Sequence, residues 1–222
     1  MALSLFQSGA RVLCLSPHPD DTEFGVGATL WKYRADFVAQ VLVFSDRAST
    51  RAEMHNERDQ RRAIECLGLS SDTVRFVDQL GYNFGRLPVR FFGTEENRDL
   101  IRRTVSKAIA DFGPDIIFTP ALRETFQDHS ALSEEVVRIA RGKYMILGYE
   151  VPKHNLHFQP NVFVDVDEAA IDAKTAALDC FSEFTTRYYF DKDAIRSLAR
   201  TRALHAGYLG LVEAFEMYRF AT

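Results

Sequence analysis

The sequence has few cysteines, no strong excess of one charge and no long apolar run, and each absence narrows the class of protein. Its three cysteines, Cys14, Cys66 and Cys180, stand far apart among apolar residues. An odd number of isolated cysteines is typical of free thiols in a reducing compartment, so we expect a cytoplasmic protein without a disulfide framework. The net charge of -4 comes with no basic stripe, which argues against nucleic acid as a partner.

The apolar residues lie in short runs. None approaches the roughly 20 residues that cross a bilayer, so no membrane span is expected. Residues 1–10 lack the basic start and the apolar core of a secretory signal, and none is expected there. With 222 residues, of which 46% are hydrophobic, the chain is long enough to bury a substantial core. We therefore expect residues 1–222 to form a single domain.

Short apolar runs alternate with amphipathic stretches along the chain. Strands are expected at residues 11–16, 38–45, 74–77, 116–119, 145–149 and 161–166, and helices at residues 25–33, 51–67, 97–112, 130–141, 168–184 and 193–211. This alternation predicts an α/β fold, a Rossmann-like three-layer sandwich with a mostly parallel sheet. Sites in such folds lie at the carboxyl ends of the strands, so the loops at His18, Ser45 and residues 120–129 should open onto one crevice.

The first strand is followed by a turn with three ionisable side chains within four residues. In the segment SPHPDD, residues 16–21, prolines flank His18 and fix the backbone, and Asp20 and Asp21 follow directly. Side chains held in this way are pre-aimed, as metal binding requires. A capped turn with an aspartate at the start of the next helix would explain the same residues without a metal.

A second pair of such residues, Asp128 and His129, follows the fourth strand at the start of a helix. Alone, this pair would be explained by an N-cap aspartate beside a surface histidine. Because the sheet brings the two loops together, His18, Asp21 and His129 would instead form a two-His, one-carboxylate set. Such a set with open positions suits Zn²⁺ with a water molecule, or Fe²⁺. The metal lowers the pKa of its water toward about 7, and the adjacent Asp20 would accept the proton.

These residues carry a resemblance to a known family. The stretch PHPDDTEFGVGATL resembles the opening motif of the PIG-L/LmbE-like zinc de-N-acetylases. The resemblance extends through the segments AIECLG at residues 63–68, PDIIFT at residues 114–119 and FQPNVFVDV at residues 158–166. It implies hydrolysis of the acetamido group of an N-acetylated amino sugar or sugar conjugate. It also implies a small-molecule partner and association into homo-oligomers.

The resemblance also implies roles for individual residues. His18, Asp21 and His129 become the metal ligands, and Asp20 becomes the general base. Asp128 becomes the second catalytic aspartate, which orients a ligand.

One position departs from the family pattern. In the sugar-deacetylase branch the second motif usually reads His-Gln-Asp-His, whereas residues 126–129 read FQDH. The histidine missing at Phe126 is the family's candidate for stabilising the oxyanion or protonating the leaving amine. Phenylalanine does neither, and the loss of one such donor costs about 100- to 1,000-fold in rate.

Three explanations of Phe126 stay open. Another group supplies the lost donor, the substrate needs less help, or the chain binds metal and sugar with impaired catalysis. The candidates for a replacement donor are Arg47, Arg123, His154 and His157.

The expected substrate-binding residues are Arg47, Arg123 and Asn161. Arg47 follows the second strand and would grip a phosphate or a sugar hydroxyl, and Asn161 matches the family's Pro-Asn pair. Two other classes of protein fit less well. A phosphotransferase turn at residues 20–22 leaves the preceding histidine without a role, and residues 25–27 lack the full dinucleotide fingerprint.

Overall fold

The structure is a computed structural model that describes residues 6–45, 53–80, 93–140, 144–181 and 188–220. Its strands are β1 Ala10–Ser16, β2 Phe37–Val43, β3 Val74–Phe76, β4 Ile116–Pro120, β5 Met145–Tyr149, β6 Val162–Val166 and β7 Leu211–Arg219. Its helices are α1 Asp21–Lys32, α2 Glu53–Cys66, α3 Glu95–Phe112, α4 Gln127–Ile139, α5 Glu168–Asp179 and α6 Lys192–His205. Short 3₁₀ turns lie at Ser71–Thr73, Val77–Leu80 and Tyr188–Phe190.

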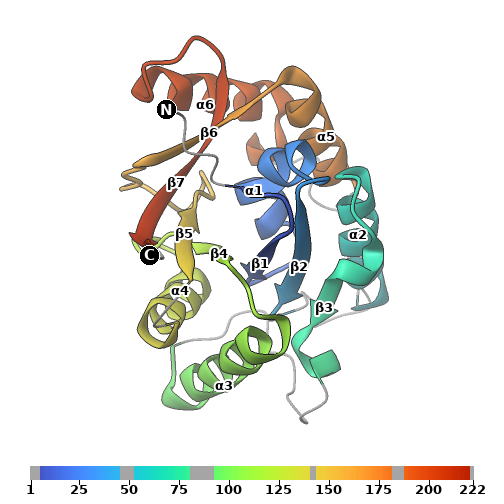
Figure 1. Cartoon of the computed structure of the whole chain (residues 1–222), viewed down its shortest axis with the longest axis vertical. Coiled ribbons are helices and arrows are strands. Elements are labelled where there is room, and N and C mark those ends of the chain that lie inside the picture. Colours follow the sequence, from blue (N-terminus) through green and yellow to red (C-terminus); the bar gives the residue numbers. More distant parts are fainter. Residues whose placement is uncertain (1–5, 46–52, 81–92, 141–143, 182–187, 221–222) are drawn as a thin grey trace.

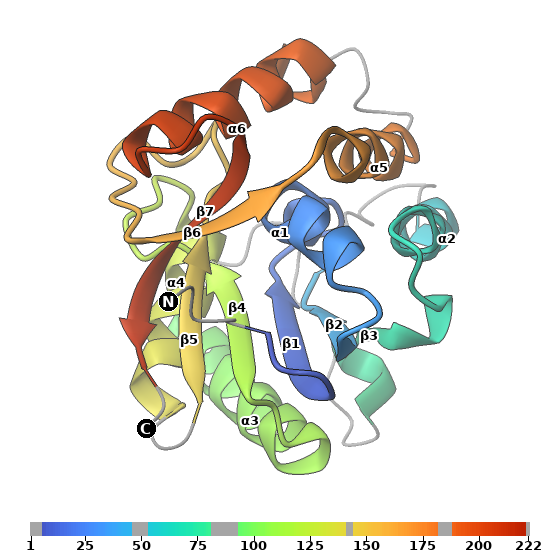
Figure 2. The same ribbon diagram turned by 45° about the horizontal axis from the view of Figure 1, so that its top comes forward.

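The described strands form one seven-stranded sheet in the order β3-β2-β1-β4-β5-β7-β6. Strands β1 to β5 pair in parallel, and β7 runs antiparallel to both of its neighbours. Figures 1 and 2 show α1, α2, α5 and α6 on one side of the sheet and α3 and α4 on the other. The predicted α/β fold with a mostly parallel sheet between helical layers is confirmed. No helix in the described residues is long and apolar enough to cross a membrane.

Strand β1 explains why the sheet is buried on both faces. Successive side chains of a strand point to opposite faces, so Val12 and Cys14 join one apolar cluster and Leu13 and Leu15 join the other. The first cluster packs under α1, α2 and α5, and the second packs under α3 and α4. A continuous apolar run is the expected pattern for such a central parallel strand. The rigid sheet then fixes the position of the loop that follows β1.

The last part of the chain differs from the sequence prediction. The helix expected at residues 193–211 ends at His205, and an unpredicted strand, β7, begins at Leu211. Gly207, with φ +66°, stands where the helix ends, a conformation that favours glycine. The helix expected to reach residue 184 ends at Asp179, and residues 182–184 lie outside the described ranges. The first helix begins earlier than expected, at Asp21, where acidic side chains favour a helix N-terminus.

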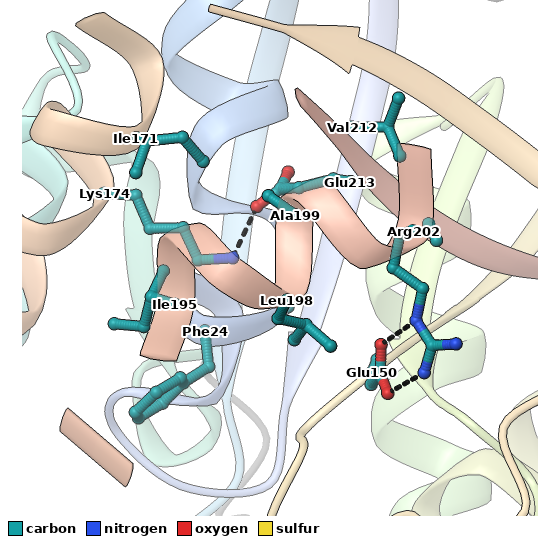
Figure 3. A pocket seen from close by; sticks show the side chains of 12 residues that line it. Phe24, Glu150, Ile171, Lys174, Ile195, Leu198, Ala199, Arg202, Val212 and Glu213 are labelled. Atoms are coloured by element: carbon teal, nitrogen blue, oxygen red, sulfur yellow. Dashed lines mark hydrogen bonds and ion pairs between the residues drawn. The ribbon is translucent and has the colours of Figure 1, made fainter. Parts of the chain in front are cut away.

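Buried ion pairs tie the later elements to the sheet (Figure 3). Lys174 Nζ of α5 lies 2.6 Å from Glu213 Oε1 of β7, and Glu213 also accepts hydrogen bonds from two backbone N–H groups of α1. Arg202 of α6 donates from Nε to Glu150, after β5, at 2.9 Å. These side chains line a cavity of about 30 Å³. Each charge here faces an opposite charge, so the group joins elements that are distant in sequence.

Candidate metal centre

The site lies at the point where the direction of the sheet order changes. From β1 the chain continues to β2 and β3 on one side, whereas β4 lies on the other side of β1. In open α/β sheets this point leaves a crevice beyond the carboxyl ends of the strands. His18, Asp20 and Asp21 follow the end of β1, and Asp128 and His129 lie in the first turn of α4, after β4. The parallel pairing of β1 and β4 therefore brings the two predicted motifs together.

A group of three buried side chains has the geometry of a metal site. Asp21 Oδ2 lies 3.3 Å from His18 Nδ1 and 3.3 Å from His129 Nε2. One ligand atom from each residue lies within 4.8 Å of the other two. A tetrahedral ion with bonds of about 2.0–2.2 Å places neighbouring ligand atoms about 3.3–3.5 Å apart. The three residues therefore fit a metal ion of this size, with at least one position left for water or substrate.

The outer nitrogen of each histidine ring faces another carboxylate. His18 Nε2 lies 2.9 Å from Asp128 Oδ2, and His129 Nδ1 lies 3.0 Å from Glu124 Oε2. Such pairs fix the tautomer and the orientation of metal-binding histidines. Asp128 thus contacts a predicted ligand, and its role in orienting that ligand stays a prediction. Glu124 was not among the predicted residues, and its only signal was an acidic side chain in the loop before His129.

The electrostatics of the group favour a cation. Burial opposes protonation of His129, but Asp21 and Glu124 outweigh it and raise the pKa of His129 to about 10. Burial also opposes protonation of His18, and its contacts with Asp128 and Asp21 raise its pKa above the ordinary value. Burial favours the neutral form of Asp21, yet the two histidines hold its pKa well below the usual range. A metal ion would meet the same negative surroundings that here favour protonated imidazoles.

Asp20 has an unusual backbone conformation. Its φ is +89°, and it is the one non-glycine residue with positive φ in the described residues. Its side chain is fully buried, and its N–H donates to Gln60 Oε1 at 3.2 Å. Left-handed conformations of this kind cost about 1–3 kcal/mol and persist where the surrounding structure imposes them, often at functional sites. The strain therefore coincides with the predicted general base.

Glu23, in the first turn of α1, is a further buried acid that the sequence did not single out. It accepts a hydrogen bond from Gln60 Nε2 at 2.5 Å, so Gln60 bridges Glu23 and the backbone of Asp20. Burial is the main cause that raises the pKa of Glu23 to about 8, with a smaller contribution from Asp20. Glu23 therefore adds to the crowding of acidic groups behind the ligand set.

Aromatic rings cover another part of the ligand group. The ring centroid of Phe126 lies 5.8 Å from that of His18 and 5.5 Å from that of His129. His154 stacks on Phe126 at 4.5 Å with 12° between the ring planes. Burial, together with the positive charge of His129, lowers the pKa of His154 to about 3. Position 126 thus brings a ring without a donor to the ligand group, and His154 brings a neutral imidazole.

Two of the predicted substrate-binding residues are exposed, and the third lies outside the described residues. Arg123 is exposed and donates from Nη1 to Gln159 at 3.2 Å. Asn161 is exposed, and its Oδ1 accepts a hydrogen bond from the backbone of Met217 in β7 at 2.7 Å. Arg47 lies outside the described residues. The role of these three residues in substrate binding stays a prediction.

The fold and the site define an α/β protein with a buried His-Asp-His group of the metal-binding type. Residues 13–140, more than half of the chain, match the family described as PIG-L: GlcNAc-PI de-N-acetylase. The chain belongs to this family of deacetylases. The matched segment runs from β1 to the end of α4 and includes both halves of the candidate metal centre.

Individual proteins resemble this chain in sequence or in fold. The chain is 27% identical over 170 residues to the uncharacterized deacetylase YaiS of Escherichia coli K12, which covers 75% of this chain and 88% of that protein. The A40926 pseudoaglycone deacetylase Dbv21 has a similar structure, with a TM-score of 0.74, 19% identity and coverage of 96% and 99%. GalB, the 4-carboxy-2-hydroxymuconate hydratase of Pseudomonas putida KT2440, has a TM-score of 0.70, 15% identity and coverage of 96% and 98%. At these identities the two solved structures show the shared fold alone, and a fold does not determine a reaction.

Proposed function

We propose that the chain is a zinc-dependent hydrolase that removes the acetyl group from an N-acetylated amino sugar or sugar conjugate. The observation that carries the proposal is the group of His18, Asp21 and His129, buried beside Asp20 in a chain of the deacetylase family. Two imidazole nitrogens and one carboxylate oxygen suit Zn²⁺, and Fe²⁺ is the alternative ion. The family description, GlcNAc-PI de-N-acetylase, supports a sugar-linked amide as substrate.

Each residue has a task in this hydrolysis. When bound, the metal supplies Lewis acidity, which polarises the amide carbonyl and lowers the pKa of water. His18, Asp21 and His129 hold the ion, and the carboxylates of Asp128 and Glu124 keep the two rings in place.

Asp20 moves the proton. Its carboxylate accepts a proton from the water that adds to the amide carbon. The same proton then passes to the amine nitrogen as the C–N bond breaks, which leaves acetate and the free amino sugar. Asp20 directly precedes the ligand Asp21, its side chain is fully buried, and its backbone is held at positive φ, which restricts where the carboxylate can lie.

Acetate release tests the proposal directly. The metal-stripped protein is reloaded with Zn²⁺ or Fe²⁺ and incubated with N-acetyl-D-glucosamine, N,N′-diacetylchitobiose and an N-acetylglucosaminyl inositol lipid. We expect acetate and a free amine from at least one substrate, activity that a chelator removes, and no activity from His129→Ala. His205→Ala, which changes an exposed histidine of α6, is the matched control and should retain activity. Stoichiometric metal without acetate release from any substrate would contradict the proposal.

A second candidate is a metal-binding sugar-recognition protein with impaired catalysis. It rests on Phe126, whose ring stands beside His18 and His129 without a hydrogen-bond donor. Calorimetric binding of an N-acetyl sugar to the zinc-loaded protein, without acetate release over hours, would support this candidate. Turnover by the unmodified protein would exclude it.

A further inference from the structure

The loop after β5 brings a third segment of the chain to the candidate metal centre. Strands β4 and β5 are parallel neighbours, so the loops that follow them open on the same edge of the sheet. His154 belongs to the loop after β5. Besides stacking on Phe126, its ring approaches that of His129 at 5.3 Å in an edge-to-face arrangement. The imidazole of His154 therefore lies beside the ligand group, although position 126, where the family pattern has a histidine, holds a phenylalanine.

Backbone hydrogen bonds fix His154 to the segment that carries Phe126. The carbonyl oxygen of His154 accepts from Thr125 N at 2.8 Å and from Thr125 Oγ1 at 2.9 Å. The N–H of His154 donates to Val151 O at 2.9 Å. These bonds hold the loop after β5 against the loop before α4. The stacked pair is therefore preorganised, as a catalytic position requires.

The polar atoms of the His154 ring are not used by the fold. Within the described chain, neither ring nitrogen has a hydrogen-bond partner, and the side chain is half-buried. A neutral imidazole carries one N–H donor whichever tautomer it adopts. Packing on Phe126 would need only the flat ring. The donor is thus free to meet a ligand in the crevice.

We infer that His154 is a catalytic residue of the proposed deacetylation, in which its ring N–H donates a hydrogen bond to the carbonyl oxygen of the substrate amide. This inference rests on the proposed function. As water adds to the amide carbon, the C–O bond forms, the carbonyl π electrons move to the oxygen and the water proton goes to Asp20. As the C–N bond breaks, these electrons return and the amine takes the proton. His154 keeps its own proton and stabilises the negative oxygen, while Phe126 supports its ring.

His154→Phe is the variant that separates this role from packing. It keeps an aromatic ring on Phe126 and removes the N–H donor. We expect kcat for acetate release to fall about 100- to 1,000-fold, with KM within about twofold and zinc content unchanged. His205→Phe makes the same side-chain change at an exposed position of α6, so it is the matched control and should keep the kcat of the unmodified protein.

An imidazole donor placed at position 126, the other ring of the stacked pair, should rescue the reaction. The double variant Phe126→His, His154→Phe exchanges the two rings in sequence and places an imidazole at position 126. We expect it to recover kcat to within about tenfold of the unmodified protein, because either ring adjoins His129. A role of His154 in packing alone would not be rescued by this exchange.

A binding experiment keeps the inference testable if the substrate class is wrong. Methylphosphonate, a tetrahedral anion, is titrated into the zinc-loaded protein by calorimetry. We expect His154→Phe to weaken its binding about tenfold or more and His205→Phe to leave it unchanged. No acetate release by the unmodified protein would defeat the proposed function and leave this titration to decide the role of His154. A His154→Phe variant with unaltered kcat, or with unaltered methylphosphonate affinity where no turnover exists, would overturn the inference.

Discussion

Two groups of buried charged side chains in this protein differ in their charge balance: one pairs each charge with an opposite charge, and the other has an excess of acids. Lys174 and Glu213, between α5 and β7, are 6% and 5% exposed, and Glu213 also accepts two backbone N–H groups (Figure 3). The candidate metal centre is buried to a similar degree, with His18 at 3% and Asp128 at 0% exposed. The first group is balanced, because each charge and each carboxylate oxygen has a partner.

The candidate metal centre is not balanced. Carboxylates outnumber the histidines, because five buried acids lie within five residues of His18 or His129 along the chain: Asp20, Asp21, Glu23, Glu124 and Asp128. Buried oxygens of three of these acids, Asp128 Oδ1, Glu23 Oε2 and Glu124 Oε1, have no hydrogen-bond partner. Such groups are costly unless something satisfies them. The comparison teaches that a balanced buried cluster holds elements together, whereas an acidic, incompletely paired cluster is suited to an ion from outside.

The largest expected effect is at Asp20, the proposed proton acceptor of the unbalanced group. Asp20→Asn keeps the size of the side chain and a residue type that tolerates positive φ, but it removes the base. We expect kcat for acetate release to fall about 100- to 10,000-fold, with zinc content and melting temperature nearly unchanged. Asp72→Asn, at an exposed aspartate of a 3₁₀ turn, is the control. A kcat within a few-fold of the unmodified protein would show that Asp20 is not the base.

The balanced group should respond in stability alone. Lys174→Met leaves Glu213 buried without its opposite charge, and breaking such a pair costs about 3–5 kcal/mol in the free energy of unfolding. Urea unfolding measures this loss, while zinc content of the folded protein should stay at one ion per chain. Arg196→Met breaks an exposed pair with Glu168 and should cost less than about 1 kcal/mol. Loss of zinc from the folded Lys174→Met variant would contradict the claim that this group acts on stability alone.

A smaller effect is expected from the carboxylates that orient the histidines. Glu124→Gln removes the charge that faces His129 Nδ1, and such changes weaken metal binding about 10- to 100-fold. Competition with a chelating dye measures the zinc affinity. The control is Glu134→Gln. Glu134 is a half-exposed residue of α4 that pairs with Arg98, and this variant protein should bind zinc normally. Equal affinities for the two variants would remove Glu124 from the metal centre.

The last expected effect is the pH dependence of stability in the chelator-treated protein. The pKa of His129 is raised from 6.5 to about 10, so its contribution to stability is complete below pH 6.5 and is lost as the pH rises toward 10. The pKa of Glu23 is raised from 4.5 to about 8, so its contribution is lost between these values. The stripped protein should therefore unfold at lower urea concentration at pH 9 than at pH 6.5. The zinc-loaded protein should lose less, because the ion replaces the proton of His129. A stripped protein that gained stability toward pH 9 would contradict the direction of these shifts.

Much of the ligand set followed from local sequence and one topological rule. His18 and Asp21 lie in a short turn after an apolar strand, and His129 begins a helix after another. The rule that parallel strands share their carboxyl edge was enough to expect them together. Asp128 was expected to orient a ligand on the resemblance to the family, and it lies 2.9 Å from His18.

Other features depend on contacts that no local pattern records. Glu124 becomes important only because its carboxylate lies 3.0 Å from His129. His154 gains its position through the path of an irregular loop and its bonds to Thr125. Strand β7 was not predicted because Glu213 and Glu216 interrupt its apolar pattern. In the folded protein both acids are buried, and Lys174 pairs with Glu213 while Tyr218 donates a hydrogen bond to Glu216. Tertiary partners, rather than propensity, decide such cases.

The left-handed backbone at Asp20 also limits which mutations this position accepts. Glycine would relieve the strain and asparagine would tolerate it, but both abolish the carboxylate. Glutamate would keep the charge, yet it bears a longer side chain in a fully buried space and a residue type rarely found at positive φ. Stability alone would therefore favour glycine at position 20, so the strained aspartate costs stability that a function of its carboxylate would offset.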